Sequence, residues 1–250
     1  MVIPDAQIRP GDDLSHIDLA AQAIVDYKPD KLIVIGDWWD FPSLNRHAMV
    51  GSKELENSRY QDDVDIGNEA LRRLVAPMEK ERVRLKRNKE KQWNPDKELF
   101  LGNHEARADK VAENDPKWSG IIGSHNCQTL DFRVHPFLKI AELDGVKYCH
   151  YFPNPFSGRP IGGTIPNRLQ HIGGSFVQGH QQGFMYGSKQ YPDHVAHGIV
   201  CGRFYTHLER YRPIDVQATE WNGIVVLNQV QNGDFDLMPL RMEYLARKYG

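Results

Sequence analysis

Cysteine is scarce in this chain, and long hydrophobic runs are absent. The three cysteines, Cys127, Cys149 and Cys201, form no C-x-x-C pair and would leave one unpaired, which argues against a disulfide framework and favours a reducing compartment. No segment approaches the roughly 18 apolar residues of a membrane-spanning helix. A charged Asp5 interrupts the amino terminus before the apolar stretch of a signal peptide can form. We therefore expect a soluble, cytoplasmic protein with no membrane partner.

The chain also lacks an excess of charge of either sign. Its 31 basic side chains nearly balance 33 acidic ones, so no global field attracts nucleic acid, and any such partner must be bound locally. With 40% apolar and 26% charged residues, the 250-residue chain can bury one substantial core. We expect a single domain over residues 1–250, with a charged helical insertion at about residues 50–95.

Apolar runs alternate with helical periodicity in the first half, and the second half is rich in strands. The runs Leu32–Ile35 and Glu98–Leu101 are typical of central strands covered on both faces. This pattern predicts a mixed α/β fold. We expect helices at 14–28, 55–92 and 105–113, and strands at 1–4, 32–35, 98–101, 146–151, 175–178, 198–201, 223–230 and 235–242, with a hairpin turn at 231–234.

Four polar islands lie at or just after these apolar runs. They are Asp5-Ala6-Gln7, Gly36-Asp37-Trp38-Trp39-Asp40, Gly102-Asn103-His104-Glu105 and Gly179-His180-Gln181-Gln182. Side chains that follow neighbouring strands converge on one edge of a sheet. Carboxylate and amide oxygens and imidazole nitrogens hold divalent cations. The islands therefore predict a metal site.

The ordered series D-x-[HQ], G-D-x-x-D, G-N-H-E, an isolated histidine and G-H-x-[HQ] resembles the calcineurin-like metallophosphoesterase superfamily over residues 5–182. The resemblance implies a four-layer αββα sandwich of two mixed β-sheets flanked by helices, and two metal ions bridged by Asp37. By position, the first ion would be bound by Asp5, Gln7, Asp37 and Gln182, and the second by Asp37, Asn103, His150 and His180. His104 would act as the acid or charge stabiliser beside the scissile phosphate.

The chemistry of these residue types agrees with that assignment. A bridging carboxylate such as Asp37 can hold two cations about 3.5 Å apart, and a hydroxide shared between them is the expected nucleophile. An imidazolium at His104 would stabilise the developing charge. Asp40 is a candidate to orient His104, with a direct or indirect role in metal binding as the alternative.

Two departures from the family pattern fall on one ion. Gln7 and Gln182 stand where family members usually carry histidine, and amide oxygen is a harder, weaker donor than imidazole. We therefore expect Mn²⁺ or Mg²⁺ to be favoured over Zn²⁺, with Fe²⁺ and Ni²⁺ also compatible. We expect one tight site and one weaker site, the weaker being the one that contains the two glutamines.

A third departure concerns the substrate. The arginine and glycine that follow the G-D-x-V-D motif in the protein serine/threonine phosphatase branch are replaced here by Phe41-Pro42-Ser43. Four side chains are candidates for substrate contacts instead, or are ordinary surface residues: Arg107, Arg159, Arg168 and His171.

Two features bear on nucleic acid. Residues 80–91 carry seven basic side chains against two acidic ones, which either guide a phosphate backbone or form a solvated helix face. Trp38 and Trp39, beside Asp37, either stack bases at the rim of the site or fill the core.

The favoured interpretation is a metallophosphoesterase, more specifically a phosphodiesterase acting on nucleotides, DNA or RNA in the manner of a nuclease. The opening Val2 to Gln7 and the segment Asp40-Phe41-Pro42-Ser43 are also similar to phosphoesterases encoded by bacteriophages. The alternatives are a phosphomonoesterase acting on proteins or small molecules, and a non-catalytic metal-binding scaffold. Retention of Asp5 and His104 argues against the scaffold. The sequence does not define the oligomeric state.

Overall fold

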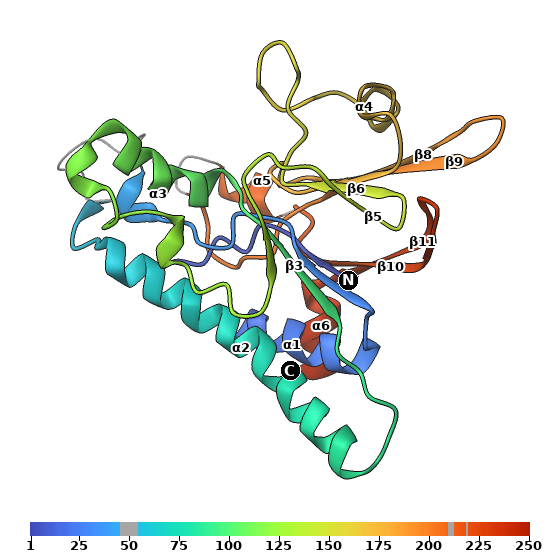
Figure 1. The fold of residues 1–250 in the computed structure, drawn as a ribbon, viewed down its shortest axis with the longest axis horizontal. Helices are drawn as coiled ribbons and strands as arrows, with labels where there is room; N and C mark the ends of the chain where they lie inside the picture. The colour runs from blue at the N-terminus through green and yellow to red at the C-terminus, as the bar shows by residue number, and fades with distance from the viewer. Residues whose placement is uncertain (46–54, 210–212, 219) are drawn as a thin grey trace.

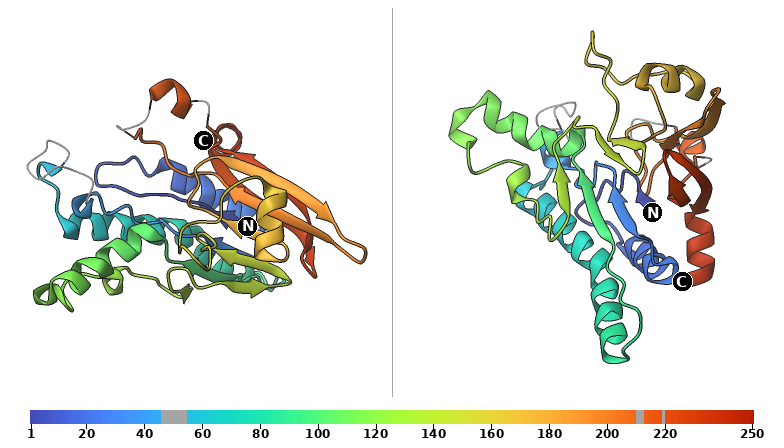
Figure 2. Two further views of the ribbon diagram at one scale, coloured as in Figure 1. Left: turned by 90° about the horizontal axis from the view of Figure 1, so that it is seen from above. Right: turned by 45° about the vertical axis from the view of Figure 1, so that its right-hand side comes forward.

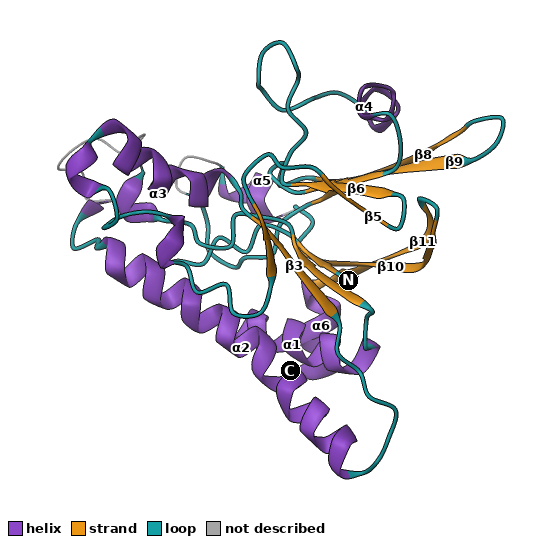
Figure 3. Cartoon of the chain, in the orientation of Figure 1, coloured by secondary structure: helices purple, strands orange, loops and turns teal. Residues whose placement is uncertain are grey.

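The computed structural model describes residues 1–45, 55–209, 213–218 and 220–250. The described residues form two mixed β-sheets with helices on their outer sides (Figure 1, Figure 3). Residues 50–54 of the expected insertion lie outside this range. None of the described helices is both long and apolar enough to cross a lipid bilayer.

The first sheet has the strand order β11-β10-β1-β2-β3-β4. Strands β1 to β4 run parallel to one another. The carboxyl-terminal hairpin of β10 and β11 pairs antiparallel with β1 through β10. Its strands are β1 (Val2–Ile3), β2 (Lys31–Val34), β3 (Asp96–Phe100), β4 (Arg133–His135), β10 (Gly223–Gln231) and β11 (Asp234–Arg241).

The second sheet has the order β5-β6-β7-β9-β8, with a parallel centre and antiparallel edges. Its strands are β5 (Ala141–Leu143), β6 (Val146–Cys149), β7 (Phe176–Gln178), β8 (Phe184–Gln190) and β9 (Val195–Cys201).

The two sheets pack face to face, because alternate residues of each strand point to opposite sides. Val2 and Ile33 pack against residues of the second sheet such as Val177 and Ile199. Their neighbours Ile3 and Val34 pack instead against the helices of the first sheet. The described chain is therefore an α/β sandwich, and Figure 2 shows its strand layers from two further directions.

Three helices pack on the outer side of the first sheet: α1 (Ser15–Tyr27), α2 (Tyr60–Arg87) and α6 (Met242–Tyr249). The short helix α4 (Ile165–Ile172) packs on the outer side of the second (Figure 1). Helices α3 (Asn103–Asn114) and α5 (Ile214–Ala218) connect strands. The helices expected at 14–28, 55–92 and 105–113 correspond to α1, α2 and α3.

The strands predicted from apolar runs are all present, and the 231–234 turn joins β10 to β11 with Asn232 and Gly233 at positive φ. Six of the described strands and α-helices were not predicted: β4, β5, β8, α4, α5 and α6. The first three are short or edge strands with many exposed residues, and α4 lies in a segment rich in glycine and proline.

Candidate metal centre

The polar islands meet where parallel strands of both sheets end. Asp5, Asp37 and Asn103 follow β1, β2 and β3, which are neighbours in the first sheet. His150 and His180 follow β6 and β7, which are neighbours in the second. Because both groups of strands present their carboxyl ends at the same end of the sandwich, residues far apart in sequence come into contact there.

Asp37, His150 and His180 form a group able to hold a metal ion. One ligand atom from each lies within 4.8 Å of the others. Asn103 joins them, because its Oδ1 lies 3.0 Å from Nε2 of His150 and 2.8 Å from Nδ1 of His180. The predicted donors of the second ion are thus in mutual contact.

Hydrogen bonds and nearby charges set the ring orientation and protonation of His150 and His180. Nδ1 of His150 donates to the carbonyl of Ile35 at 2.9 Å, which leaves Nε2 facing Asp37 Oδ2 at 3.2 Å. Burial would lower the pKa of His150, but the Asp37 carboxylate raises it to about 9. Burial and the neighbouring His150 lower the pKa of His180 to about 4, so this ring is neutral. A cation held here would therefore have to displace a proton from His150.

Two buried oxygens of the predicted first ion site have no hydrogen-bond partner among the described residues: Oδ2 of Asp5 and Oε1 of Gln7. Buried acceptors without partners are costly, and a cation is one group that satisfies them. Burial, reinforced by the nearby Asp37, raises the pKa of Asp5 to about 7. Gln182 lies two residues beyond His180 in the same loop and is half-buried.

Glu105 holds the loop that carries Asp37, a role that the sequence does not reveal. Its carboxylate is 0% exposed and accepts four backbone N–H bonds, from Asp37, Trp38, Trp39 and Gly102, at 2.7 to 3.1 Å. Gly102 is required for this approach, since a Cβ there would lie 2.1 Å from Asp37 Oδ1. The position of Glu105 in the first turn of α3 is the one local signal for its capping role.

Replacing Glu105 by glutamine is expected to lower the free energy of unfolding by about 2–4 kcal/mol. The NH₂ group of the glutamine would face backbone N–H groups, which are also donors. The remaining oxygen would accept hydrogen bonds without the help of a negative charge. Urea denaturation measures the change, and Glu69→Gln on the exposed face of α2 is the control. Equal stability of the two variants would contradict this role.

His104 lies beside the metal group without belonging to it. Its Nδ1 is 2.6 Å from Asp40 Oδ1, and its Nε2 is 3.7 Å from Asp37 Oδ2. Burial would lower the pKa of His104, but the carboxylates of Asp37 and Asp40 raise it to about 9. The Asp40 carboxylate thus contacts a ring nitrogen of His104, and its role in orienting that ring stays a prediction.

Arg9 and Glu209 extend this chain of contacts, and sequence reasoning missed both. The Arg9 guanidinium bonds Asp40 Oδ2 through Nε and Glu209 Oε1 through Nη2. Glu209 is buried and fixed by Gln217, whose side chain bonds its backbone N–H and carbonyl. The His104, Asp40, Arg9 and Glu209 side chains thus form one continuous network.

The four predicted substrate contacts occupy different environments. Arg107 is half-buried, with Nη1 3.3 Å from the carbonyls of Asp40 and Phe41, beside His104. Arg159 and His171 are exposed outside the metal group. Arg168 is only 2% exposed and bonds Gln181 Oε1, in the loop of His180. Their roles toward substrate stay predictions.

The tryptophans are core residues, so the base-stacking alternative for them is wrong. Trp38 and Trp39 are both 0% exposed. Their indole N–H groups donate to α2, at Gly67 O (2.9 Å) and Asn68 Oδ1 (3.2 Å). They fasten α2 to the Asp37 loop.

The basic segment 80–91 lies in the last turns of α2 and just beyond, at the end of the helix remote from the strand ends that carry the site (Figure 1). Several of its arginines pair locally, such as Arg84 with Glu81 and Glu90, both at 2.7 Å. This placement favours the interpretation of a solvated helix face.

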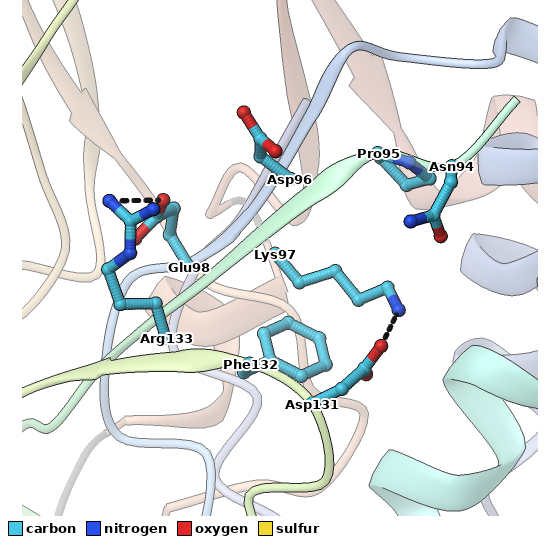
Figure 4. Close-up of a pocket in the computed structure, with 8 residues that line it drawn as sticks. All are labelled: Asn94, Pro95, Asp96, Lys97, Glu98, Asp131, Phe132 and Arg133. Atoms are coloured by element: carbon cyan, nitrogen blue, oxygen red, sulfur yellow. Dashed lines mark hydrogen bonds and ion pairs between the residues drawn. The ribbon is translucent and has the colours of Figure 1, made fainter.

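A pocket of about 400 Å³ lies at the beginning of β3 and β4 (Figure 4), and none of its lining residues is a predicted metal donor. Its basic side chains are paired, Lys97 with Asp131 and Arg133 with Glu98. The pocket offers no uncompensated cation for a phosphate.

No protein-family model matches the chain, and no match is found among curated proteins.

Proposed function

We propose that the protein is a metal-dependent phosphoester hydrolase of the calcineurin-like metallophosphoesterase type, and a phosphodiesterase acting on nucleotides or nucleic acid. The observation that carries the proposal is the meeting of donors from five strand ends around Asp37. Asp37, Asn103, His150 and His180 would hold one ion, and Asp5, Gln7, Asp37 and Gln182 a second. Bound there, divalent ions neutralise phosphate charge and activate water.

The protein's own residues supply the proton. His104 is fixed at Nδ1 by Asp40, so its Nε2 carries a proton toward the metal group. A protonated imidazole at this place can donate to the oxygen of the departing group. Arg9 and Glu209 hold Asp40 in position and thereby hold the ring.

The charge of the site supports a diester over a monoester. A diester carries one negative charge and a monoester about two near neutral pH. Of the arginines at the site, Arg9 is neutralised by Asp40 and Glu209, and Arg107 is directed to two backbone carbonyls. Of these two arginines only Arg107 keeps its charge for a phosphate, and one cation compensates a monoanion better than a dianion.

Hydrolysis of bis(p-nitrophenyl) phosphate and p-nitrophenyl phosphate, with Mn²⁺ and after chelation, tests the proposal. We expect Mn²⁺-dependent hydrolysis of the diester, faster than that of the monoester. Preference for the monoester would identify a phosphomonoesterase. Inactivity on both substrates with every divalent metal would leave a metal-binding scaffold.

Restoring histidine at the glutamine positions is expected to tighten the weaker ion site. In the double variant Gln7→His with Gln182→His, imidazole nitrogens replace amide oxygens, so affinity for a second Zn²⁺ should rise at least about tenfold. Calorimetric titration counts the sites and their affinities. Gln61→His with Gln92→His, both exposed, is the control. Two equally tight Zn²⁺ ions in the unmodified protein would contradict the expectation.

A further inference from the structure

Arg168 is a buried cation without a carboxylate partner among the described residues. Its side chain projects from α4 and is nine-tenths or more buried. Nε donates to Gly163 O at 2.9 Å and Nη2 to Gln181 Oε1 at 2.5 Å, both uncharged acceptors. Nη1 is buried and has no acceptor in the part of the chain that the structure describes. A buried guanidinium is normally paired, because the loss of hydration is costly.

The guanidinium lies at the amino end of α4. Its partner Gly163 immediately precedes Thr164, the N-cap residue, whose side chain makes no capping hydrogen bond. Gly162, Gly163 and Thr164 are all exposed. First-turn N–H groups and the helix dipole favour an anion at such an end. Two independent features, a helix end whose N-cap side chain makes no capping hydrogen bond and an unpaired buried cation, therefore favour negative charge at one place.

This place is connected to the metal centre. Gln181, which accepts from Arg168, is the residue between His180 and Gln182. A ligand at the start of α4 is thus separated from the metal group by the loop that carries two of its predicted donors.

We propose that the amino end of α4, with Arg168, Gly162, Gly163 and Thr164, is a second phosphate-binding site, which takes a phosphate group of the substrate next to the one being hydrolysed. The binding of phosphate is inferred from the environment of Arg168. The assignment of that phosphate to the substrate rests on the proposed function. It assigns the substrate to phosphoesters with more than one phosphate, such as an oligonucleotide.

Thermal unfolding in EDTA tests the site without requiring activity. Inorganic phosphate is added in a series at constant ionic strength. The unmodified protein is expected to gain about 5 °C or more in a saturable manner. Arg168→Met should lose the saturable gain, whereas Arg247→Met, on the exposed face of α6, should keep it. Equal gains in all three proteins, or no gain in the unmodified protein, would overturn the proposal.

Two variants at an exposed position provide a second test, which holds even if the Arg168 variant does not fold. A Cβ at Gly162 meets no atom within 4 Å, so Gly162→Asp and Gly162→Asn are sterically matched and differ in charge. The aspartate should abolish the phosphate response and the asparagine retain it; equal responses would overturn the proposal.

A kinetic experiment with Mn²⁺ tests whether the site binds substrate. It compares the KM of a 5′-phosphorylated dinucleotide with that of bis(p-nitrophenyl) phosphate. Gly162→Asp should raise the KM of the dinucleotide, relative to that of the smaller diester, about tenfold over Gly162→Asn. A phosphate response without this KM effect would mean that the site takes free phosphate rather than substrate. Absence of all hydrolysis would count against the proposed function and leave the binding result in EDTA standing.

Discussion

Asp37→Asn is expected to lose tight divalent-ion binding and, with it, hydrolysis. Asp37 is the carboxylate among the four predicted donors of the tighter ion, and it also supports the charge of His150 and His104. The amide removes the negative charge while keeping the shape. We expect Mn²⁺ affinity to fall at least about a hundredfold. Hydrolysis should fall by about a thousandfold, since metal binding contributes several kcal/mol to transition-state stabilisation.

The two readouts come from separate measurements. Calorimetry with Mn²⁺ reports binding, and turnover of bis(p-nitrophenyl) phosphate reports catalysis. Asp131→Asn, which disturbs the Lys97 ion pair at the opposite end of β3, is the matched control. The variant should stay folded, because Glu105 holds the backbone of the loop through bonds that the substitution does not touch. Mn²⁺ binding as tight as that of the unmodified protein would contradict the proposed centre.

Much of the fold is readable from local pattern, because buried parallel strands need continuous apolar runs. Leu32–Ile35 and its neighbours have side chains that pack on both faces, Ile33 between the sheets and Val34 under the helices. Each such run ends at a polar island, and strand order then brings the islands together. For this reason Asp37 and His180 were identifiable from their islands, whereas His150, 113 positions beyond Asp37, was assigned only through the family resemblance.

Other features depend on contacts that no local pattern encodes. Arg9 and Glu209 are 200 residues apart, and nothing near either one indicates the other. The sequence also left open whether Trp38 and Trp39 are at the rim or in the core. Acceptors on α2, at Gly67 and Asn68, decide in favour of the core. These tertiary contacts show that both tryptophans, candidates for binding by sequence, are structural residues.

His104 can act on the departing group in two ways: it can donate a proton, or it can stabilise negative charge without proton transfer. Asp40 bonds its Nδ1, and the raised pKa keeps the ring protonated. Both roles need that state. They differ in how the requirement depends on the departing group, because a poor leaving oxygen needs a proton and a good one does not.

His104→Ala is therefore expected to lower kcat by about 10²–10⁴ on a diester with an alcohol leaving group, such as a dinucleotide, and by much less on bis(p-nitrophenyl) phosphate. Mn²⁺ affinity should stay within a few-fold, because His104 lies outside the group formed by Asp37, His150 and His180. Steady-state kinetics on the two substrates and calorimetry with Mn²⁺ provide the comparison, with His125→Ala as the control. An equal loss on both substrates would assign charge stabilisation to His104. A loss of metal affinity that accounts for the whole kinetic effect would instead make His104 part of the metal centre and remove the basis for an acid held by Asp40.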